Sequence, residues 1–514
     1  HRDLHSFPTR RSSDLFSIPR KNLTKGSWRQ CTPAQVRDFS AVGYAFAREL
    51  WKNTNVAVGV ICSYWGATKI ESWMSADMLR SHPQYTRMVE RTDTDTNNWN
   101  RLVRESIRNE YLRDSIANAA NEGIRARVHL KDYPDTAWKT CTYPMNMPNM
   151  DLTNYWGFVW LRKKFFLPAE YEKTDFIIRF PVVCRNYEIY LNGNPVFFEE
   201  DEITKSRIYT IRGEQFNRPD NVLAIRMTVY WGYGAIGQQG VEPLLVSRDG
   251  KKTIALTGKW HYHAGIEPPV PQRQDYNSRI NVLFNGMIAP LMPYGIRGVI
   301  WYQGEQNTSN ARAYRNLFPM LINDWRIRWQ QGYFPFLYVQ LANYYPRKEN
   351  PSEDVWAELR EAQMMTLSQP NTGMAVAIDL GEANDIHPKQ KIPVGQRLFL
   401  AAQKIAYGKE LVHSGPIYDS MYIKGNTIRI RFTSVGSGLV SKDNKPLKSF
   451  AIAGADMVFQ WADAVIINNE VVVSSPLVPD PVAVRYAWES NPDATLYNRE
   501  GLPASPFRTD YMKK

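Results

Sequence analysis

Apolar residues are spaced in two different ways along this chain. In the first 75 residues, and again after residue 281, short continuous apolar runs alternate with segments whose apolar residues recur at helical spacing. The runs are typical of buried parallel strands, and they are Val56–Ile61, Gly298–Gln303, Phe336–Leu341 and Ala375–Ile378. Helices are predicted from Thr32–Pro33 to about residue 50 and over 311–331, 355–367 and 391–406. This alternation predicts a parallel sheet covered by helices.

The middle of the chain has a different spacing, with short β-branched and aromatic runs and no helical pattern between them. The predicted strands are Trp156–Phe166, Asp175–Phe180, Tyr187–Leu191, Arg207–Ile211 and Asn221–Val229. Asn192-Gly193 is a strong hairpin-turn signal between two of these runs. The pattern predicts a β-sandwich or jelly roll.

Because α/β alternation lies on both sides of this block, we predict one parallel sheet interrupted by an inserted domain. The expected parts are 16–135 and 269–408 for the α/β domain, 136–268 for the insertion, and 409–514 for a small C-terminal β domain. That last domain rests on strands at 427–432, 471–474 and 482–488. Residues 75–130 are charged and predicted to be mainly helical.

The amino-acid composition argues against some classes of function but does not identify one. The 514 residues carry a net charge of +12, but Lys and Arg are dispersed, so we do not expect nucleic-acid binding. No apolar run is long enough to cross a membrane. The four cysteines lack metal-ligand spacing, and neither a metal nor another cofactor is expected. The 16 Trp and 28 Tyr suit stacking on sugar rings as well as packing in a core.

Residues His1–Leu15 are unlike the rest of the chain. HRDLHSFPTRRSSDL resembles an in-frame translation of a sequencing-library adapter, so we treat 1–15 as non-native and leave it out of the fold prediction. We therefore expect the natural N-terminus, with any signal peptide, to be missing.

Three polar loops follow predicted strands, and open parallel sheets bind ligands beyond the carboxyl ends of their strands. The loops are Trp65–Thr68, Gln303–Asn307 and Asp385–Pro388. The last one places Asp385 two residues before His387, a pairing that suits a general base and its orienting acid. Together the loops predict a donor-rich pocket beside an acid–base pair, which is what acyl transfer requires.

Several segments carry a resemblance to a known family. IRGVIWYQGEQN, NVLFNGMIAPLMPYGI, IDLGEANDIHP, PVGQRL and VAVGVICSYWGATKIESW resemble the sialate O-acetylesterases, carbohydrate esterases of the SGNH-hydrolase type. The resemblance covers nearly everything after about residue 25. It implies a three-layer, flavodoxin-like α/β fold with a parallel sheet, and an inserted jelly roll of the galactose-binding-like type.

The resemblance also implies residue roles. A serine nucleophile would remove O-acetyl groups from sialic acid or a related glycan through an acyl-enzyme, with His387 as the base and Asp385 as its orienter. The Gly66 N–H and the side chain of Gln303 or Asn307 would match oxyanion donors, and Glu305 would brace the pocket. An acetylated glycan is the expected partner, and a periplasmic or extracellular location follows from the family. The oligomeric state stays open.

Two departures from the family pattern matter. The SGNH pattern often places Asp three residues before His, so Asp379 or Glu382 are alternatives to Asp385. The Gly-Gln-Ser-Asn-like block that holds the nucleophile is absent, and we predict that it lay upstream of residue 16. Ser63, one residue after a predicted strand, is better explained as a turn hydroxyl. Ser437 is not flanked by the strand and helix of a nucleophile elbow.

Other functions remain open at this stage. An acetylxylan or xyloglucan esterase would share the chemistry but not the substrate, and a non-catalytic carbohydrate-binding protein would use only the jelly roll. A glycosidase is less favoured, because Glu305 would need a second carboxylate at a suitable distance. His261 and His263 alternate on a predicted strand and, without further ligands, suit sugar contacts or the surface better than a metal.

Overall fold

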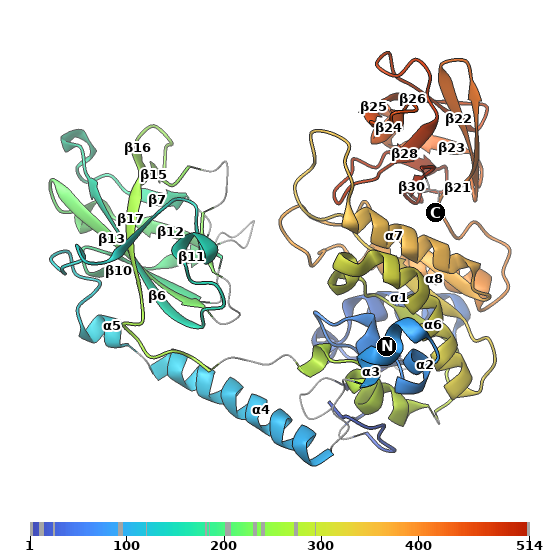
Figure 1. Ribbon diagram of the computed structural model, residues 1–514, viewed down its shortest axis with the longest axis horizontal. Helices are drawn as coiled ribbons and strands as arrows, with labels where there is room; N and C mark the ends of the chain where they lie inside the picture. The colour runs from blue at the N-terminus through green and yellow to red at the C-terminus, as the bar shows by residue number, and fades with distance from the viewer. Residues whose placement is uncertain are drawn as a thin grey trace. The chain divides into compact units, whose positions relative to one another are not determined.

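The computed structural model divides into two compact units, described separately here (Figure 1). The α/β unit comprises residues 1–100 and 275–514, and the β unit comprises residues 101–274. The structure describes residues 4–9, 15–23, 26–90, 96–119, 121–179, 182–183, 186–200, 207–229, 234–237, 242–271, 276–292 and 294–510.

The centre of the α/β unit is a parallel sheet of three strands in the order β18 (Val299–Trp301), β19 (Phe336–Gln340) and β20 (Thr372–Val376). Helix α6 (Ala311–Trp329) connects the first two strands, α7 (Val355–Met365) the next two, and α8 (Lys391–Ile405) follows the third. These elements lie where the sequence predicts them, within a few residues. Every residue of β19 and β20 is buried, as their unbroken apolar runs require.

A second sheet in this unit contains β3 (Val58–Ser63), which pairs in parallel with β1 (Leu4–Thr9). β1 also pairs with β2 (Arg29–Gln30) in antiparallel fashion, and it lies inside the segment 1–15 that the sequence prediction left out. Within the described residues no strand joins β3 to β18, so the predicted single parallel sheet is not found: the structure has one parallel sheet, β18-β19-β20, and one mixed sheet, β2-β1-β3. In the part of the chain that the structure describes, β3 pairs only with β1 and β18 pairs only with β19, so neither sheet extends to the other.

Helix α1 (Ala41–Thr54) begins later than predicted. Ser40 is its N-cap, with Oγ accepting a hydrogen bond from Gly43 N at 3.1 Å, whereas the Thr32–Pro33 segment leads into a 3₁₀ turn at Val36–Asp38. α1 packs on β3 and α8, and the shared core of this region includes Leu50, Leu337 and Leu398.

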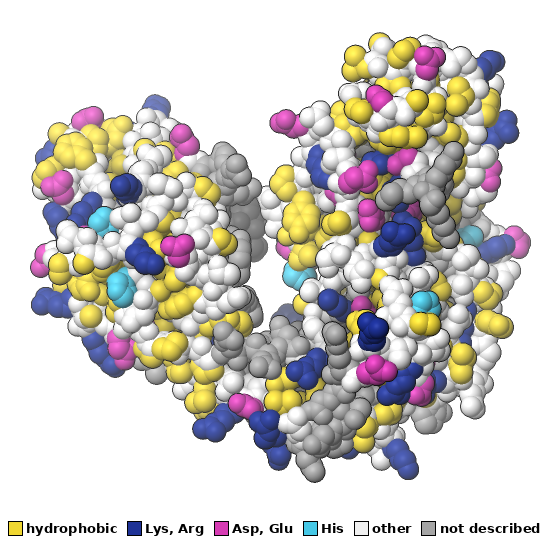
Figure 2. Space-filling model, in the orientation of Figure 1, with side chains coloured by type: hydrophobic (Ala, Val, Ile, Leu, Met, Phe, Trp, Pro, Cys, Tyr) yellow, Lys and Arg dark blue, Asp and Glu magenta, His cyan; other side chains and the backbone are white. Residues whose placement is uncertain are grey.

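The charged stretch after residue 75 is helical, as expected. It forms α2 (Ala76–Arg80), α3 (Pro83–Glu90), α4 (Thr96–Ala119) and α5 (Glu122–Arg125). No helix in the described ranges has both the length and the apolar character needed to cross a membrane. On the face shown in Figure 2, Lys and Arg side chains are scattered among acidic and apolar ones.

The β unit consists of antiparallel sheets, and its main apolar core lies among their strands. Its six-stranded sheet has the order β10 (Asn194–Val196), β9 (Asn186–Leu191), β13 (Asp220–Val229), β6 (Gly157–Phe166), β17 (Lys259–Ala264) and β4 (Lys139–Thr142). The five-stranded sheet has the order β11 (Phe198–Glu200), β12 (Arg207–Ile211), β7 (Phe176–Arg179), β15 (Leu244–Ser247) and β16 (Thr253–Ala255). A smaller sheet joins β5 (Met145–Asn146), β14 (Ala235–Ile236) and β8 (Val182–Val183).

Local sequence determines much of this unit. Asn192 and Gly193 have φ of 50° and 93° and form the turn between β9 and β10, the backbone that Asn-Gly favours. The compact unit begins at Arg101, earlier than the boundary at 136 drawn from the sequence. Ile124, Val128 and Tyr133 pack with Trp160 of β6 in a small apolar cluster that is separate from the main core, so this partly helical lead-in packs on the strands of the β unit.

The C-terminal strands form small antiparallel sheets that belong to the α/β unit and pack against its helix α7. Buried Arg360 of α7 joins the two, since its guanidinium donates to the carbonyls of Glu489 and Ser490 at 2.8 and 2.9 Å. The strands are β21 (Ile417–Lys424), β22 (Thr427–Thr433), β23 (Leu439–Ser441), β24 (Phe450–Ala453), β25 (Gln460–Trp461), β26 (Asp463–Ile467), β27 (Glu470–Ser474), β28 (Ala483–Tyr486), β29 (Leu496–Asn498) and β30 (Phe507–Arg508).

Candidate active site

The loops after β3 and β18 are joined by side-chain amides, and we call this contact the loop junction (Thr68, Ile70, Glu71, Gln303 and Asn307). Gln303 Nε2 donates to the Thr68 carbonyl at 2.9 Å and to Asn307 Oδ1 at 2.7 Å. Both hydrogens of this amide therefore have acceptors inside the protein. The sequence placed Gln303 and Asn307 at corresponding strand ends, and the structure brings them together.

Asn307 is the centre of the loop junction and only 1% exposed. Its Oδ1 also accepts from Ile70 N at 2.9 Å, and its Nδ2 donates to buried Glu71 Oε2 at 2.9 Å. A buried amide with three such bonds holds two loops in one arrangement, because leaving any of these groups unpaired is costly. The loop junction is thus a rigid frame at the carboxyl ends of β3 and β18.

The turn that precedes Thr68 presents a backbone donor. Gly66 is exposed, and its N–H has no hydrogen-bond partner among the residues that the structure describes. Ala67 follows with φ of 54°, a left-handed conformation that is unusual for alanine. The Thr68 hydroxyl closes the turn by donating to the Trp65 carbonyl at 2.9 Å.

The acid–base loop lies between β20 and α8. Asp385 Oδ1 accepts from the backbone N–H of His387 at 2.8 Å and lies 3.4 Å from the ring Nδ1. The side chain of His387 is 87% exposed, so its ring is open to solvent.

The two carboxylates that were alternatives to Asp385 contact other side chains. Asp379 makes a two-armed ion pair with Arg397, at 2.6 and 2.8 Å, and its Oδ2 also accepts from the Tyr497 hydroxyl at 3.1 Å. Glu382 accepts from Lys389 Nζ at 3.0 Å. Of the three carboxylates weighed from the sequence, Asp385 is the one whose contact with the His387 ring is found in the described structure.

Glu305 lies between Gln303 and Asn307 in the loop after β18, and its carboxyl group is influenced by the charges of Lys391 and His387. Burial raises the pKa of Glu305, against the opposing effects of backbone N–H groups and the charges of Lys391 and His387. Burial likewise lowers the pKa of Lys391, which Glu305 and Asp385 oppose. The electrostatic influence of these side chains on one another places Glu305, Lys391 and the Asp385–His387 pair in one neighbourhood.

Lys391 was missed by the sequence reasoning. It is the first residue of α8, where a cation opposes the helix dipole, and it lies 5.5 Å from the centre of the Tyr302 ring. A lysine at that position is a signal that the sequence did contain, because an unfavourable charge at a helix start needs compensation. Here Glu305 and Asp385 supply the negative charge.

The serines considered from the sequence are placed as follows. Ser63 ends β3, and its Oγ is buried without a hydrogen-bond partner in the described structure, so the expected turn hydrogen bond is not found. Ser437 Oγ donates to Glu500 Oε1 at 2.6 Å in a loop between β22 and β23.

The two histidines of β17 have partners of their own. His261 Nδ1 lies 2.7 Å from the Asp135 carbonyl oxygen, and the His263 ring lies 5.5 Å from that of Trp138. Among the residues described, no cluster of His, Cys, Asp and Glu suits a metal ion.

Comparisons with known proteins agree with this picture. The family model "carbohydrate esterase, sialic acid-specific acetylesterase" matches residues 265–404, a span that contains Gln303, Glu305, Asn307, Asp385 and His387. The chain is 33% identical over 259 residues to the sialate O-acetylesterases of Mus musculus and Homo sapiens, an alignment covering 45% of the chain and 47% and 49% of those proteins. The chain thus spans about half the length of these curated relatives.

A solved structure shows similarity along nearly the whole chain. A carbohydrate acetylesterase from Xanthomonas citri is 27% identical with a TM-score of 0.60, covering 99% of this chain and 74% of that one. The predicted resemblance to sialate O-acetylesterase-type carbohydrate esterases, which are carboxylic ester hydrolases, is confirmed.

Proposed function

We propose that this protein is a carbohydrate O-acetylesterase whose substrate is an O-acetylated sialic acid or a related acetylated glycan. The observation that carries the proposal is the position of the family match, 265–404, because it spans both the Gln303–Asn307 loop and the Asp385–His387 loop. Hydrolysis of an ester through an acyl-enzyme needs a nucleophile, a base and a hydrogen-bond donor to the oxyanion. The described residues suit the first two.

In this proposal His387 takes the proton of the nucleophile and later activates water, while Asp385 orients the ring. The exposed imidazole and its contact with Asp385 Oδ1 at 3.4 Å support these roles. Gly66 supplies a backbone N–H to the oxyanion, a contribution of about 10²–10³ in rate for one donor. Gln303 and Asn307 act by fixing the loop on which Gly66 lies, since both Gln303 amide hydrogens already have acceptors.

Glu305 braces the pocket in this scheme. Burial raises the pKa of its carboxyl group. The neighbouring cation of Lys391 limits that shift. Glu305 therefore adjusts the charge around His387 without reacting itself.

The proposal must also account for the nucleophile. The Gly-Gln-Ser-Asn-like block of the family is not found in the sequence, and we propose that a serine upstream of residue 16 in the natural gene serves His387. The finer architecture is proposed on the same basis. The α/β unit would be a three-layer SGNH-type domain, the β unit an inserted jelly roll, and the natural protein would be exported.

Hydrolysis of an aryl acetate by the purified chain, alongside the His387→Ala variant, tests this scheme. We expect no difference between the two, because the base has no serine to activate. Turnover that His387→Ala abolishes would overturn the missing-nucleophile proposal and make Ser63 the first residue to mutate. Restoring the upstream segment should give activity on acetylated glycans, and a panel of sialic acid, xylan and xyloglucan acetates would identify the sugar.

A further inference from the structure

The loop that follows β19 (residues 341–354) lies at the same edge of the sheet as the candidate active site. β19 is the central strand of the parallel sheet, with β18 on one side and β20 on the other. Because the carboxyl ends of parallel strands meet at one edge, this loop follows between the Gln303–Asn307 loop and the Asp385–His387 loop. Its side chains are therefore placed to meet a ligand bound at that edge.

Tyr345 of this loop has a backbone conformation that is unfavourable for a large side chain. Its φ is 73°, in the left-handed region that glycine and asparagine adopt at lower cost. Two hydrogen bonds hold it there: Tyr345 N donates to the Ala383 carbonyl at 3.1 Å, and the Tyr345 carbonyl accepts from Asn491 Nδ2 at 2.7 Å. Strained residues that the surrounding structure holds in place cluster at functional sites.

The contact with Ala383 joins Tyr345 to the loop that carries the acid–base pair, since Ala383 lies two residues before Asp385. A second contact joins the same two loops, because Asn343 Oδ1 accepts from Gly381 N at 2.6 Å. A Cβ atom at position 381 would collide with the Asn343 carbonyl, so glycine is what allows the loops to come this close. The Tyr345 ring and the acid–base pair thus lie on loops that are bonded to each other.

The ring of Tyr345 is supported from within the protein and is also open to solvent, since the residue is 49% exposed. Its centre lies 4.0 Å from that of the Tyr344 ring and 5.8 Å from that of the Trp356 ring. Trp356 is buried, and its Nε1 donates to the Ala342 carbonyl at 2.9 Å. A ring held in this way loses little freedom when a ligand binds to it. The electron-rich face of such a ring attracts polarised C–H bonds, like those on one face of a pyranose.

Polar side chains lie close in sequence to the residues that hold this ring. Arg347 is two residues from Tyr345, and Asp493 is two residues from Asn491. Arg347 Nη1 lies 3.3 Å from Asp493 Oδ2, and the two side chains are 58% and 34% exposed. An accessible donor and acceptor beside an aromatic ring offer a sugar both kinds of contact, to its hydroxyls and to its C–H face.

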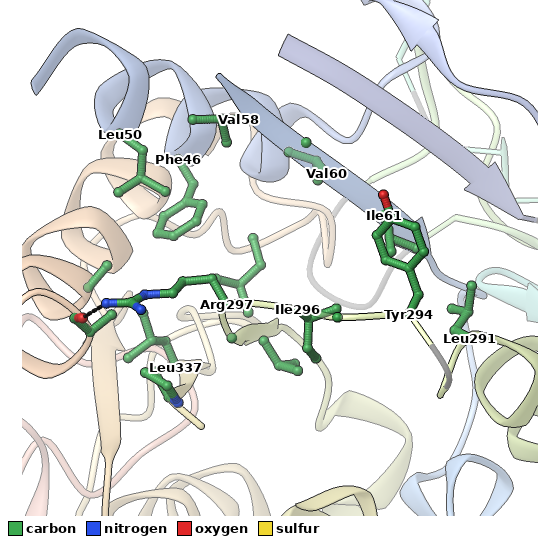
Figure 3. Close-up of a pocket in the computed structure, with 18 of the residues that line it drawn as sticks. Phe46, Leu50, Val58, Val60, Ile61, Leu291, Tyr294, Ile296, Arg297 and Leu337 are labelled. Carbon is green, nitrogen blue, oxygen red and sulfur yellow. Dashed lines mark hydrogen bonds between the residues drawn. The ribbon is translucent and has the colours of Figure 1, made fainter. Parts of the chain in front are cut away.

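The groove between β3 and β18 suits a sugar less well. It has a volume of about 430 Å³, and most of the side chains that line it are apolar, such as Phe46, Leu50 and Ile296 (Figure 3). Hydroxyl groups buried among such side chains would lose hydrogen bonds to water with few side-chain partners to replace them. A sugar on the exposed Tyr345 ring avoids that cost.

We propose that Tyr345 is the platform on which a sugar ring of the substrate glycan stacks, bringing an ester on that glycan toward the Asp385–His387 loop. The ligand class is a pyranose that turns one C–H face to the Tyr345 ring and its hydroxyls to Arg347 and Asp493. The identity of the ligand as the glycan substrate rests on the proposed function. A stacking role explains why an aromatic residue stands where asparagine or glycine would fit the backbone at lower cost.

Saturation-transfer NMR of the purified full chain measures this binding without turnover. The probes are the methyl glycoside of 9-O-acetyl-N-acetylneuraminic acid, acetylated xylotetraose, and the unacetylated form of each. We expect at least one probe to bind, with the strongest saturation on the protons of one face of a sugar ring. Tyr345→Asn removes the ring but suits the left-handed backbone, and it should weaken that binding about tenfold.

Two matched variants separate stacking from other roles. Tyr345→Phe keeps the ring and should bind like the unaltered chain, because stacking does not need the hydroxyl. Tyr333→Asn changes a tyrosine that is 64% exposed just before β19, at the opposite edge of the sheet, and should also leave binding unchanged.

A measurement on the unaltered chain covers the case in which Tyr345→Asn does not fold. With fluorotyrosine incorporated throughout the chain, the fluorine NMR signal that disappears in Tyr345→Phe belongs to Tyr345. We expect that signal to shift when the bound probe is added, and a signal that stays in place would contradict stacking.

Three binding results would overturn the platform. They are no binding of any probe, binding that Tyr345→Asn leaves unchanged, and an equal loss of binding in Tyr333→Asn. None of them decides the esterase proposal, which is judged by turnover after the upstream segment is restored. Conversely, binding of the unacetylated sugars alone, lost in Tyr345→Asn, would support the platform and count against the esterase.

Discussion

The two halves of the candidate site differ in how the protein holds them. Asn307, at the centre of the loop junction, is 1% exposed and makes three hydrogen bonds, whereas the His387 side chain is 87% exposed with Asp385 as its near neighbour. The loop junction is therefore built into the packing of the α/β unit, while the Asp385–His387 loop is open to solvent. We expect the loop junction to contribute more to stability than the exposed loop does.

The same contrast appears among the strands. β19 and β20 are buried along their whole length, but β3 and β18 are half-buried and border a groove. β20 is an edge strand like β3 and β18, so a strand neighbour on one edge only does not by itself explain why β3 and β18 are less buried.

The largest expected effect compares the two aspartates of the His387 region. Asp379→Asn removes the charge that pairs with Arg397, whose side chain is only 12% exposed, so we expect a loss of about 3 kcal/mol in the free energy of unfolding. Asp385→Asn, at an exposed loop position, should cost about 0.5 kcal/mol or less. Urea denaturation of both variants measures the difference, and equal losses would contradict the contrast between the packed Asp379 carboxylate and the exposed Asp385 carboxylate.

The Asp379 effect also has a pH signature. Burial acts to raise the pKa of Asp379, but the hydrogen bonds and charge of Arg397 outweigh it and lower the pKa. A lowered pKa in the folded state gives stability that is present above the unfolded value of about 4 and is lost as the pH falls through the folded value. The gap in unfolding free energy between the unaltered chain and Asp379→Asn should thus be full at pH 7 and shrink below about pH 4. A constant gap would exclude an ion-pair origin.

The next effect tests the rigid frame. Asn307→Ala leaves Ile70 N–H and the Glu71 carboxylate without their partner in a buried site, which should cost about 2 kcal/mol of unfolding free energy. Asn310→Ala, on an exposed residue of the same 3₁₀ helix (Glu305–Asn310), is the matched control and should change stability by less than about 0.5 kcal/mol. A neutral Asn307→Ala would show that the loop junction is not a frame.

The smallest effect concerns the turn that presents Gly66. Ala67 has φ of 54°, where glycine is favoured, so Ala67→Gly should raise the unfolding free energy by about 0.5 kcal/mol. Ala406→Gly, at φ of −95°, should lower it instead. Thermal unfolding of the two variants gives the sign of each change, and a destabilising Ala67→Gly would mean that the Ala67 methyl group has a packing role.

The sequence was most informative where structure is local. The hairpin at Asn192-Gly193 and the buried strands β19 and β20 follow from turn chemistry and apolar runs. The start of α1 was mispredicted because Thr32–Pro33 and Ser40 both offer cap-like residues, and only packing chooses between them. The single sheet was mispredicted because strand pairing depends on neighbours distant in sequence.

The candidate site was predicted in outline. The three polar loops at strand ends identified Gly66, Gln303 and Asn307 as neighbours, and the structure joins their loops. Sequence spacing does not predict that both amide hydrogens of Gln303 have acceptors within the protein. It also does not predict that Asp379 pairs with Arg397. Those facts depend on which side chains the fold brings within hydrogen-bonding distance.

The most direct test of the central claim, an acid–base pair without its serine, is labelling by a fluorophosphonate probe. This reagent reacts with a serine that a nearby histidine activates. The account predicts that the purified chain and its His387→Ala variant show the same background labelling, with no modified serine in the peptide that contains Ser63. Stoichiometric labelling of one serine that disappears in His387→Ala would contradict it.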